Sequence, residues 1–153
     1  MDAAQLLIFS LEQQRYALRV ETVDRVIRAV AVTPLPKAPE IVLGVLDLHG
    51  QVIPLIDLRR RFGLPTRKLR TSDQFVIARA GLLTVALAVD GTESVQQVLP
   101  EAIQEAGGIV SGTEFLEGVT RNEEGLVLIH DLGTLLFPEE ARALARALEG
   151  TPA

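Results

Sequence analysis

Cysteine and tryptophan are absent from this 153-residue chain, which has one tyrosine and two histidines. Without cysteine the protein has no disulfide, no thiolate metal ligand and no cysteine nucleophile. No nucleophile elbow, Walker loop or dinucleotide glycine pattern occurs either. The glycines of Gly107 to Gly112 lack the lysine and hydroxyl pair of a phosphate loop, so we expect a flexible loop there. These absences predict that the protein is not an enzyme.

Long apolar runs are also missing. The longest, Leu82 to Val89, includes Thr84 and is too short to cross a bilayer, and the N-terminus has no secretory signal pattern. The net charge of −5 opposes non-specific attraction to nucleic acid or to an anionic membrane. An apolar content of 48% provides ample material for a core. We therefore expect a folded, cytoplasmic protein.

The two histidines, His49 and His130, are the strongest candidate metal ligands. Each has an aspartate nearby, in Asp47-x-His49 and in His130-Asp131, but neither has a second histidine at ligand spacing. We expect no metal site and no other cofactor.

The chain contains an internal repeat. Gly44 to Leu58, "GVLDLHGQVIPLIDL", matches Gly118 to Leu132, "GVTRNEEGLVLIHDL", at a shift of seventy-four residues. A weaker match, at a shift of sixty-nine, relates residues 16–31 to residues 85–100. Because both matches occur in the same order, we interpret them as a degenerate duplication. Length alone leaves open a single domain or two fused units of about 70 residues.

Alternating apolar residues predict a chain dominated by β-strands. Residues 20–30 have apolar spacing that suits a short helix, although the second half of this segment can also be a strand. Pro54 lies within a predicted strand, and because proline has no amide donor we place it at a sheet edge or a bulge. The other expected strands are residues 6–11, 16–20, 45–48, 52–56, 75–78 and 82–89.

Asp57 and Asp131 occupy matching positions in the repeat, and each is well placed as a structural helix cap. After Asp57, Leu58 and Phe62 fall on the buried face of a short helix. The intervening arginines, Arg59 to Arg61, are expected to point outward.

A second helix is predicted over residues 138–150, with proline in its first turn and an apolar stripe along one side. Docking against the chain's own barrel is the simpler interpretation of this stripe, and binding to a partner is the alternative.

A cluster of basic residues supports a hypothesis of RNA binding. Single-strand binding normally adds stacking aromatic side chains, and only Phe62 is available here. A solvated face or a protein-docking patch is therefore favoured, with a small-barrel RNA-binding protein as the alternative function. The cluster comprises Arg59, Arg60, Arg61, Arg67, Lys68 and Arg70.

The whole pattern resembles the CheW family of chemosensory coupling proteins. The resemblance runs from about Leu6 to Phe137 and is densest over "GVLDLHGQVIPLIDLRRRFGLP". The later segments "DQFVIA", "ALAVDGTESVQQV" and "EFLEGVTRNEEGLVLIHDLGTLL" are similar to the family's second half.

This resemblance implies a single CheW-like domain over residues 1–153, all-β with short helices. It would contain two packed, five-stranded barrels of the Src-homology type, at residues 5–65 and 73–137, followed by the helix at 138–150. It also implies a non-catalytic adaptor between the regulatory domain of a CheA-type histidine kinase and the cytoplasmic tip of a methyl-accepting chemoreceptor. Neither nucleic-acid binding nor membrane insertion is implied.

Carried over by position, the resemblance places the receptor-binding surface at seven residues. The family's turn usually reads leucine-arginine-glycine, whereas His49 replaces the arginine here, and Arg25 stands where some relatives have glutamate. A histidine is mostly neutral at neutral pH, so the permanent charge and paired donors of arginine are lost. The valines among the seven fit an ordinary core equally well. The residues are Val23, Arg25, Val26, Val45, Leu46, His49 and Gly50.

Overall fold

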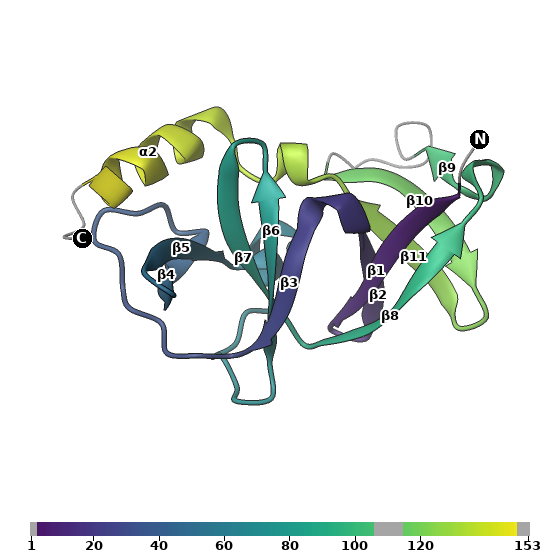
Figure 1. Ribbon diagram of the computed structural model, residues 1–153, viewed down its shortest axis with the longest axis horizontal. Coiled ribbons are helices and arrows are strands. Elements are labelled where there is room, and N and C mark those ends of the chain that lie inside the picture. Colours follow the sequence, from purple (N-terminus) through teal and green to yellow (C-terminus); the bar gives the residue numbers. More distant parts are fainter. Residues whose placement is uncertain (1–2, 106–114, 150–153) are drawn as a thin grey trace.

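The computed structural model describes residues 3–105 and 115–149, and the loop expected at Gly107 to Gly112 lies outside them. The described chain is mostly β-structure, in two sheets with a helix at the C-terminal end (Figure 1). This confirms the predicted fold class. The strands are β1 (Ala4–Leu11), β2 (Gln14–Arg19), β3 (Val23–Arg28), β4 (Val42–Leu48), β5 (Gln51–Ile56), β6 (Gln74–Ala80), β7 (Leu83–Val89), β8 (Gly91–Val98), β9 (Gln104–Glu105), β10 (Leu116–Asn122) and β11 (Gly125–His130).

Each sheet closes on itself into a small barrel. Barrel A is the six-stranded sheet, in the order β8-β1-β2-β11-β10-β9, and barrel B is the five-stranded sheet, in the order β3-β6-β7-β5-β4. In barrel B the chain leaving β3 returns to the far edge, where the Thr33 and Val45 backbones exchange hydrogen bonds of 2.9 and 2.8 Å. In barrel A the chain leaving β8 pairs as β9 with β10. Both sheets thereby cover edges that an open sheet would expose.

The family resemblance implied one barrel from residues 5–65 and one from residues 73–137, but the structure divides the strands differently. Barrel B takes its strands from residues 23–89, and barrel A takes its strands from residues 4–19 and 91–130. The two repeats exchange strands, because β3 of the first repeat pairs with β6 and β8 of the second repeat pairs with β1.

The exchange is symmetrical, which supports the internal repeat. The parallel pair of β5 with β7 in barrel B matches the parallel pair of β11 with β2 in barrel A. A bulge between Val42 and Gly44 recurs between Leu116 and Gly118, seventy-four residues later. Both repeats therefore adopt one topology.

The apolar residues of β1 show how the two barrels share a core. Leu6 and Ile8 point into barrel A, whereas Leu7 and Phe9 point the other way, into a central cluster. That central cluster also contains Val76 and Leu87 of barrel B. Because successive strand residues face opposite sides, a strand between two cores is apolar at nearly every position. The barrels thus form one packed unit.

The helix predicted for residues 20–30 does not form. The segment forms a 3-10 turn at Val20–Thr22 and then β3, so the strand alternative for its second half is confirmed. β-branched residues such as Val23, Val26 and Ile27 favour a strand. Pairing with β6 decides between the two interpretations, which local spacing alone does not.

Pro54 is buried in β5, between β4 and β7, and so is not at a sheet edge. Val45, opposite Pro54 on β4, uses its N–H and C=O for Thr33 on the other side. The position of Pro54 therefore needs no donor toward β4, and pairing with β7 begins only at Leu55. The missing N–H of proline leaves no ladder bond broken.

Both predicted caps are confirmed. The Asp57 side chain accepts a hydrogen bond from the Arg60 N–H at the start of α1 (Leu58–Arg61), and Asp131 accepts one from the Gly133 N–H at the start of a 3-10 turn, Leu132–Thr134. The second cap therefore begins a tighter turn instead of an α-helix.

The C-terminal helix α2 (Pro138–Glu149) docks on barrel B (Figure 1), as the simpler interpretation predicted. Leu144 and Ala147 are buried against Leu35 and Val45. Ala141, in the first turns of α2, is exposed and lies outside this buried stripe.

Both repeats have glycine at one matched position, Gly44 and Gly118, because the segment of chain that closes each barrel crosses directly over it. A Cβ at Gly44 would lie 2.5 Å from the Thr33 carbonyl oxygen. A Cβ at Gly118 would lie 2.9 Å from the Gln104 carbonyl oxygen and 2.8 Å from Ile103 Cγ2. Only glycine fits without moving the strand that closes each barrel.

We expect Gly118→Ala to lower the free energy of unfolding by about 1–3 kcal/mol, because the added methyl overpacks a backbone crossing. Gly91→Ala is the matched control, since a Cβ there meets nothing closer than 3.8 Å. It is expected to change stability by no more than about 0.5 kcal/mol. Urea denaturation measures both, and equal stability of the two variants would contradict the steric explanation.

Candidate functional site

The predicted receptor-binding residues fall into an exposed group and a buried group. His49 and Gly50 form the tip of the hairpin between β4 and β5, where both have positive φ values of 52° and 84°. Two such residues make the turn type that matches the twist of paired strands. The Gly50 N–H donates to the Asp47 carboxylate at 3.0 Å, which fixes the turn and leaves the His49 side chain exposed.

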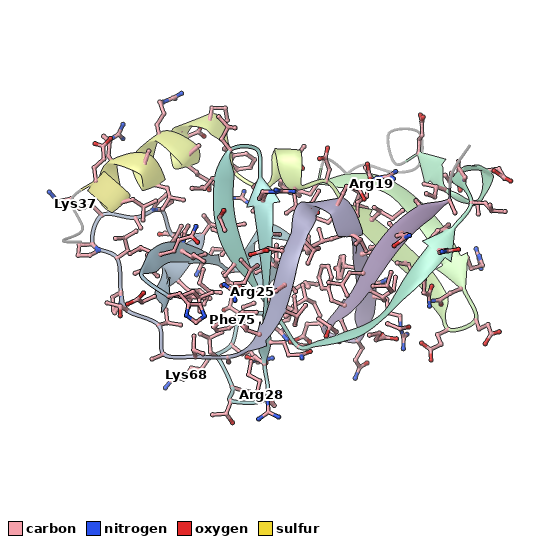
Figure 2. The ribbon with its side chains drawn as sticks, in the orientation of Figure 1. Arg19, Arg25, Arg28, Lys37, Lys68 and Phe75 are labelled. Carbon is pink, nitrogen blue, oxygen red and sulfur yellow. The ribbon has the colours of Figure 1, made fainter. Side chains whose placement is uncertain are left out.

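Arg25 is also exposed, on β3. Figure 2 shows Arg25 and Arg28 along this strand. The only carboxylate paired with Arg25 among the described residues is its neighbour Asp24, at 3.8 Å. Both side chains are largely in water, where such a pair contributes little. The Arg25 guanidinium is therefore available to a partner.

Val45 and Leu46 belong to the core. Val45 is 7% exposed and lies beneath α2, whereas Leu46, on the opposite face of β4, is 1% exposed in the core of barrel B. Val23 and Val26 are half-buried against the central core. For Val45 and Leu46 the structure therefore favours the interpretation as ordinary core residues.

Only part of the basic cluster forms a cationic surface. Arg59 and Arg61 were expected to point outward, but the exposed fractions of their side chains are only 8% and 6%. Arg59, Arg61 and Arg67 instead form ion pairs inside the protein, whereas Arg60, Lys68 and Arg70 are exposed. Half of the basic residues that suggested RNA binding are thus engaged with the protein's own carboxylates.

Arg59 lies at the centre of the largest of these ion-pair networks, at the junction of the two barrels. Its guanidinium pairs with Glu12, in the turn between β1 and β2, and with Asp90, at the crossing from β7 to β8. Arg67 pairs with Asp90 at 2.7 Å and forms two bonds to Asp73, of 2.8 and 3.0 Å. The network joins both barrels to the linker between the repeats.

Hydrogen bonds in this network control the charge of its aspartates. Burial raises the pKa of Asp90, but hydrogen bonds from the Arg59 guanidinium and the Glu12 N–H outweigh it, and the net pKa lies below its usual value. The pKa of Asp73 is likewise lowered, because bonds from Arg67 and the Arg70 N–H outweigh its burial. Both carboxylates are therefore ionised at neutral pH.

Arg61 connects α1 to the C-terminal helix. Its guanidinium pairs with Glu140 of α2 and lies over the Phe137 ring, 4.3 Å from the centroid. Glu140 also accepts the Phe137 N–H at 2.8 Å, at the start of α2. A cation over an aromatic face adds to the ion pair.

His130 is a buried structural residue, 3% exposed. One ring nitrogen, Nδ1, lies 2.8 Å from the Phe115 carbonyl oxygen, and the ring packs edge-on against Phe62. Burial lowers the pKa of His130 to about 4, so the ring is neutral at pH 7 and Nδ1 carries the proton that it donates. Within residues 3–105 and 115–149, no three potential ligands gather into a metal site.

Sequence reasoning missed Glu12, Asp73 and Asp90. No motif marks them, because they approach Arg59 and Arg67 only through the strand exchange. The one available signal was the alignment of Asp90 with Glu21 in the repeat, which shows an acidic residue at both crossings.

The described residues thus form two small barrels that pack together and present exposed turns and strands. The family model described as "CheW-like domain" matches residues 5–139, and the chain belongs to this family.

Named relatives of similar length support this assignment. The chain is similar to a chemotaxis protein CheW of Treponema pallidum, with 28% identity over 92% of this chain and 86% of that protein. A chemotaxis protein CheW of Rhizobium meliloti is 29% identical, over 92% of each chain. A protein FrzA of Myxococcus xanthus is 25% identical, over 93% and 91%.

A solved structure has the same fold. The scaffolding protein TtCheW from Thermoanaerobacter tengcongensis matches with a TM-score of 0.82 and 27% identity, over 92% of this chain and 96% of that one. Across the described ranges, no helix is long and apolar enough to span a membrane.

We expect Asp90→Asn to destabilise the protein by about 2 kcal/mol at pH 7, because it leaves the buried Arg59 without full charge compensation. The cost stays below that of a fully buried pair, since the Asp90 side chain is 29% exposed. Because its pKa is lowered by folding, the carboxylate stabilises the fold above about pH 4 and loses this effect as the pH falls further.

The control is Asp24→Asn, which removes an exposed carboxylate and is expected to change stability by no more than about 0.5 kcal/mol. Chemical denaturation at pH 7 and pH 3 measures these effects. A similar loss in both variants at pH 7 would show that the network does not stabilise the fold.

The burial of His130 predicts a second pH dependence of the free energy of unfolding. Because the neutral form is buried, stability is complete above the unfolded pKa near 6.5 and falls as the pH drops toward 4. Between pH 7 and pH 5 the loss should be about 2 kcal/mol. In His130→Ile, which copies Ile56 at the matching position, this loss should disappear. Persistence of the full loss in the variant would assign it to other groups.

Proposed function

We propose that this protein is a non-catalytic scaffold of a chemosensory system, coupling methyl-accepting chemoreceptors to a CheA-type histidine kinase. The family match over residues 5–139 carries this proposal. The relatives named for chemotaxis and the solved scaffolding protein, each matching nearly the whole chain, support it.

The surfaces of the two barrels also fit a protein with two partners. Although the repeats share one topology, the exposed or half-exposed residues at matched positions differ. Leu43 in the first repeat corresponds to Glu117 in the second, and Gln13 corresponds to Leu82. Burial constrains the matched core positions, whereas these surface positions are free to bind different proteins.

Within this function, the receptor tip would contact the exposed members of the predicted surface. These are the hairpin tip at His49 and Gly50 and the guanidinium of Arg25, with Val23 and Val26 beside it. The regulatory domain of the kinase would bind elsewhere on the barrels. Such a protein works in the cytoplasm, at receptor arrays, and needs neither a cofactor nor nucleic acid.

The direct test uses the full chain as bait in extracts of its native cells, followed by binding assays with the purified kinase regulatory domain and a receptor cytoplasmic fragment. We expect both proteins to be recovered and both purified fragments to bind. Recovery of a nucleotide-processing complex, with no binding to either fragment, would overturn the proposal.

We expect His49→Arg to strengthen binding to a receptor fragment from a system whose scaffold has arginine in this turn. A charged hydrogen bond at an exposed rim corresponds to about a 2- to 5-fold gain in affinity. His49→Gln, which adds no charge, is the control. Calorimetric titration measures all three proteins, and identical affinities would remove this turn from the receptor interface.

A further inference from the structure

The internal repeat creates two matching grooves where the barrels meet, and only one of them is filled. Leu43, Asp57, Arg59 and Ala88 line the first groove, and their partners in the repeat line the second. These partners are Glu117, Asp131, Gly133 and Arg19.

The protein fills the first groove with its own side chains. The Arg59 guanidinium enters from α1 and pairs with Glu12 and Asp90, and Arg67 adds its bonds to Asp73 and Asp90. The volume left in this groove is about 10 Å³, less than the space of one water molecule.

The second groove lacks the corresponding side chains. Gly133 stands where the first groove has Arg59, and Gly81 stands where it has Glu12. The result is an open cleft of about 180 Å³, which we call the Arg79 cleft. It is larger than a single water needs, but a helix about 10 Å wide would not enter it. Its size suits one or two side chains of a bound protein.

A count of the charges around the Arg79 cleft shows what it can bind. The Glu117 carboxylate is paired with Arg19, and the Asp131 carboxylate accepts the Gly133 N–H at 2.9 Å. Arg79, on β6, has a 2.8 Å bond to the Glu21 carbonyl oxygen and no carboxylate partner within the described residues. Nε2 of His130, an acceptor in the lining, is buried away from solvent.

The cations are on the accessible sides of the cleft. Arg79 is exposed, and Arg19, from the end of β2, is half-exposed at the upper edge of the molecule (Figure 2). The two residues come from different barrels, so a group between them would touch both. Arginine binds carboxylates through paired donors, and exposed arginines keep this capacity.

We infer that the Arg79 cleft binds an aspartate or glutamate side chain of the receptor tip, in the way that the protein's own charges fill the matching groove. This inference rests on the proposed function. The bound carboxylate would pair with Arg79 and the free donors of Arg19. Glu117 and Asp131, already engaged, would limit binding to a single acidic group through repulsion of further negative charge.

The test measures binding of a purified receptor cytoplasmic fragment to the full chain and to four variants. Arg79→Glu should weaken binding about tenfold, because it replaces attraction by repulsion. Arg79→Lys should lose less, and Gly133→Arg, which introduces the side chain present in the filled groove, should weaken binding by occluding the cleft. The control is Arg142→Glu, an equal change of charge at an exposed position of α2, which should stay within about twofold.

Thermal unfolding establishes that each variant is folded, and titrations at rising salt should narrow the difference between Arg79→Glu and the unmodified chain. If the unmodified chain binds the receptor fragment and both Arg79→Glu and Gly133→Arg bind equally well, the cleft is not the site and the scaffold function stands. If the unmodified chain binds neither the receptor fragment nor the kinase domain, both proposals fail.

Discussion

The passage of one strand over a glycine of another is the constraint on which the whole architecture depends. At Gly44 and at Gly118 the crossing backbone occupies the space of a side chain, so each sheet bends back on itself and closes. Closure allows the chain leaving β3 to return to β4 and the chain leaving β8 to return to β10. Without these crossings each sheet would keep an open edge, and the central core would lose the shape that both barrels share.

The sequence was sufficient to predict the β-rich class, both aspartate caps and the C-terminal helix. Each of these follows from a local pattern, such as the alternation of apolar residues or a carboxylate just before a helical turn. The paired barrels came from the family resemblance. The division of strands between the barrels was predicted wrongly, because β3 carries no local feature that distinguishes pairing with β6 from pairing inside its own repeat. Only packing across the central core decides it.

The same distinction applies to the candidate site. The family resemblance pointed to His49, Gly50 and Arg25, which are exposed. It also pointed to Val45 and Leu46, which share the apolar character of the core in which they lie. For Arg59 and Arg61 the prediction was wrong in the opposite direction, because they were expected to be exposed and are buried. Their charge suggests a solvated surface, yet carboxylates from distant segments neutralise them in the interior. Those carboxylates are brought close by the tertiary fold, which the spacing of residues along the chain does not reveal.

The exchange of strands also determines the order in which the protein can assemble during its synthesis. Every strand of barrel B lies between residues 23 and 89, so this barrel has all its strands when little more than half of the chain has been made. β1 and β2 can pair with each other early, and the side of β1 with Leu7 and Phe9 can pack against barrel B. The other side, with Leu6 and Ile8, stays uncovered until β8 and β11 leave the ribosome. Some of the earliest residues to be translated are thus among the last to complete their packing, and in this interval the nascent protein exposes an apolar strand face to aggregation.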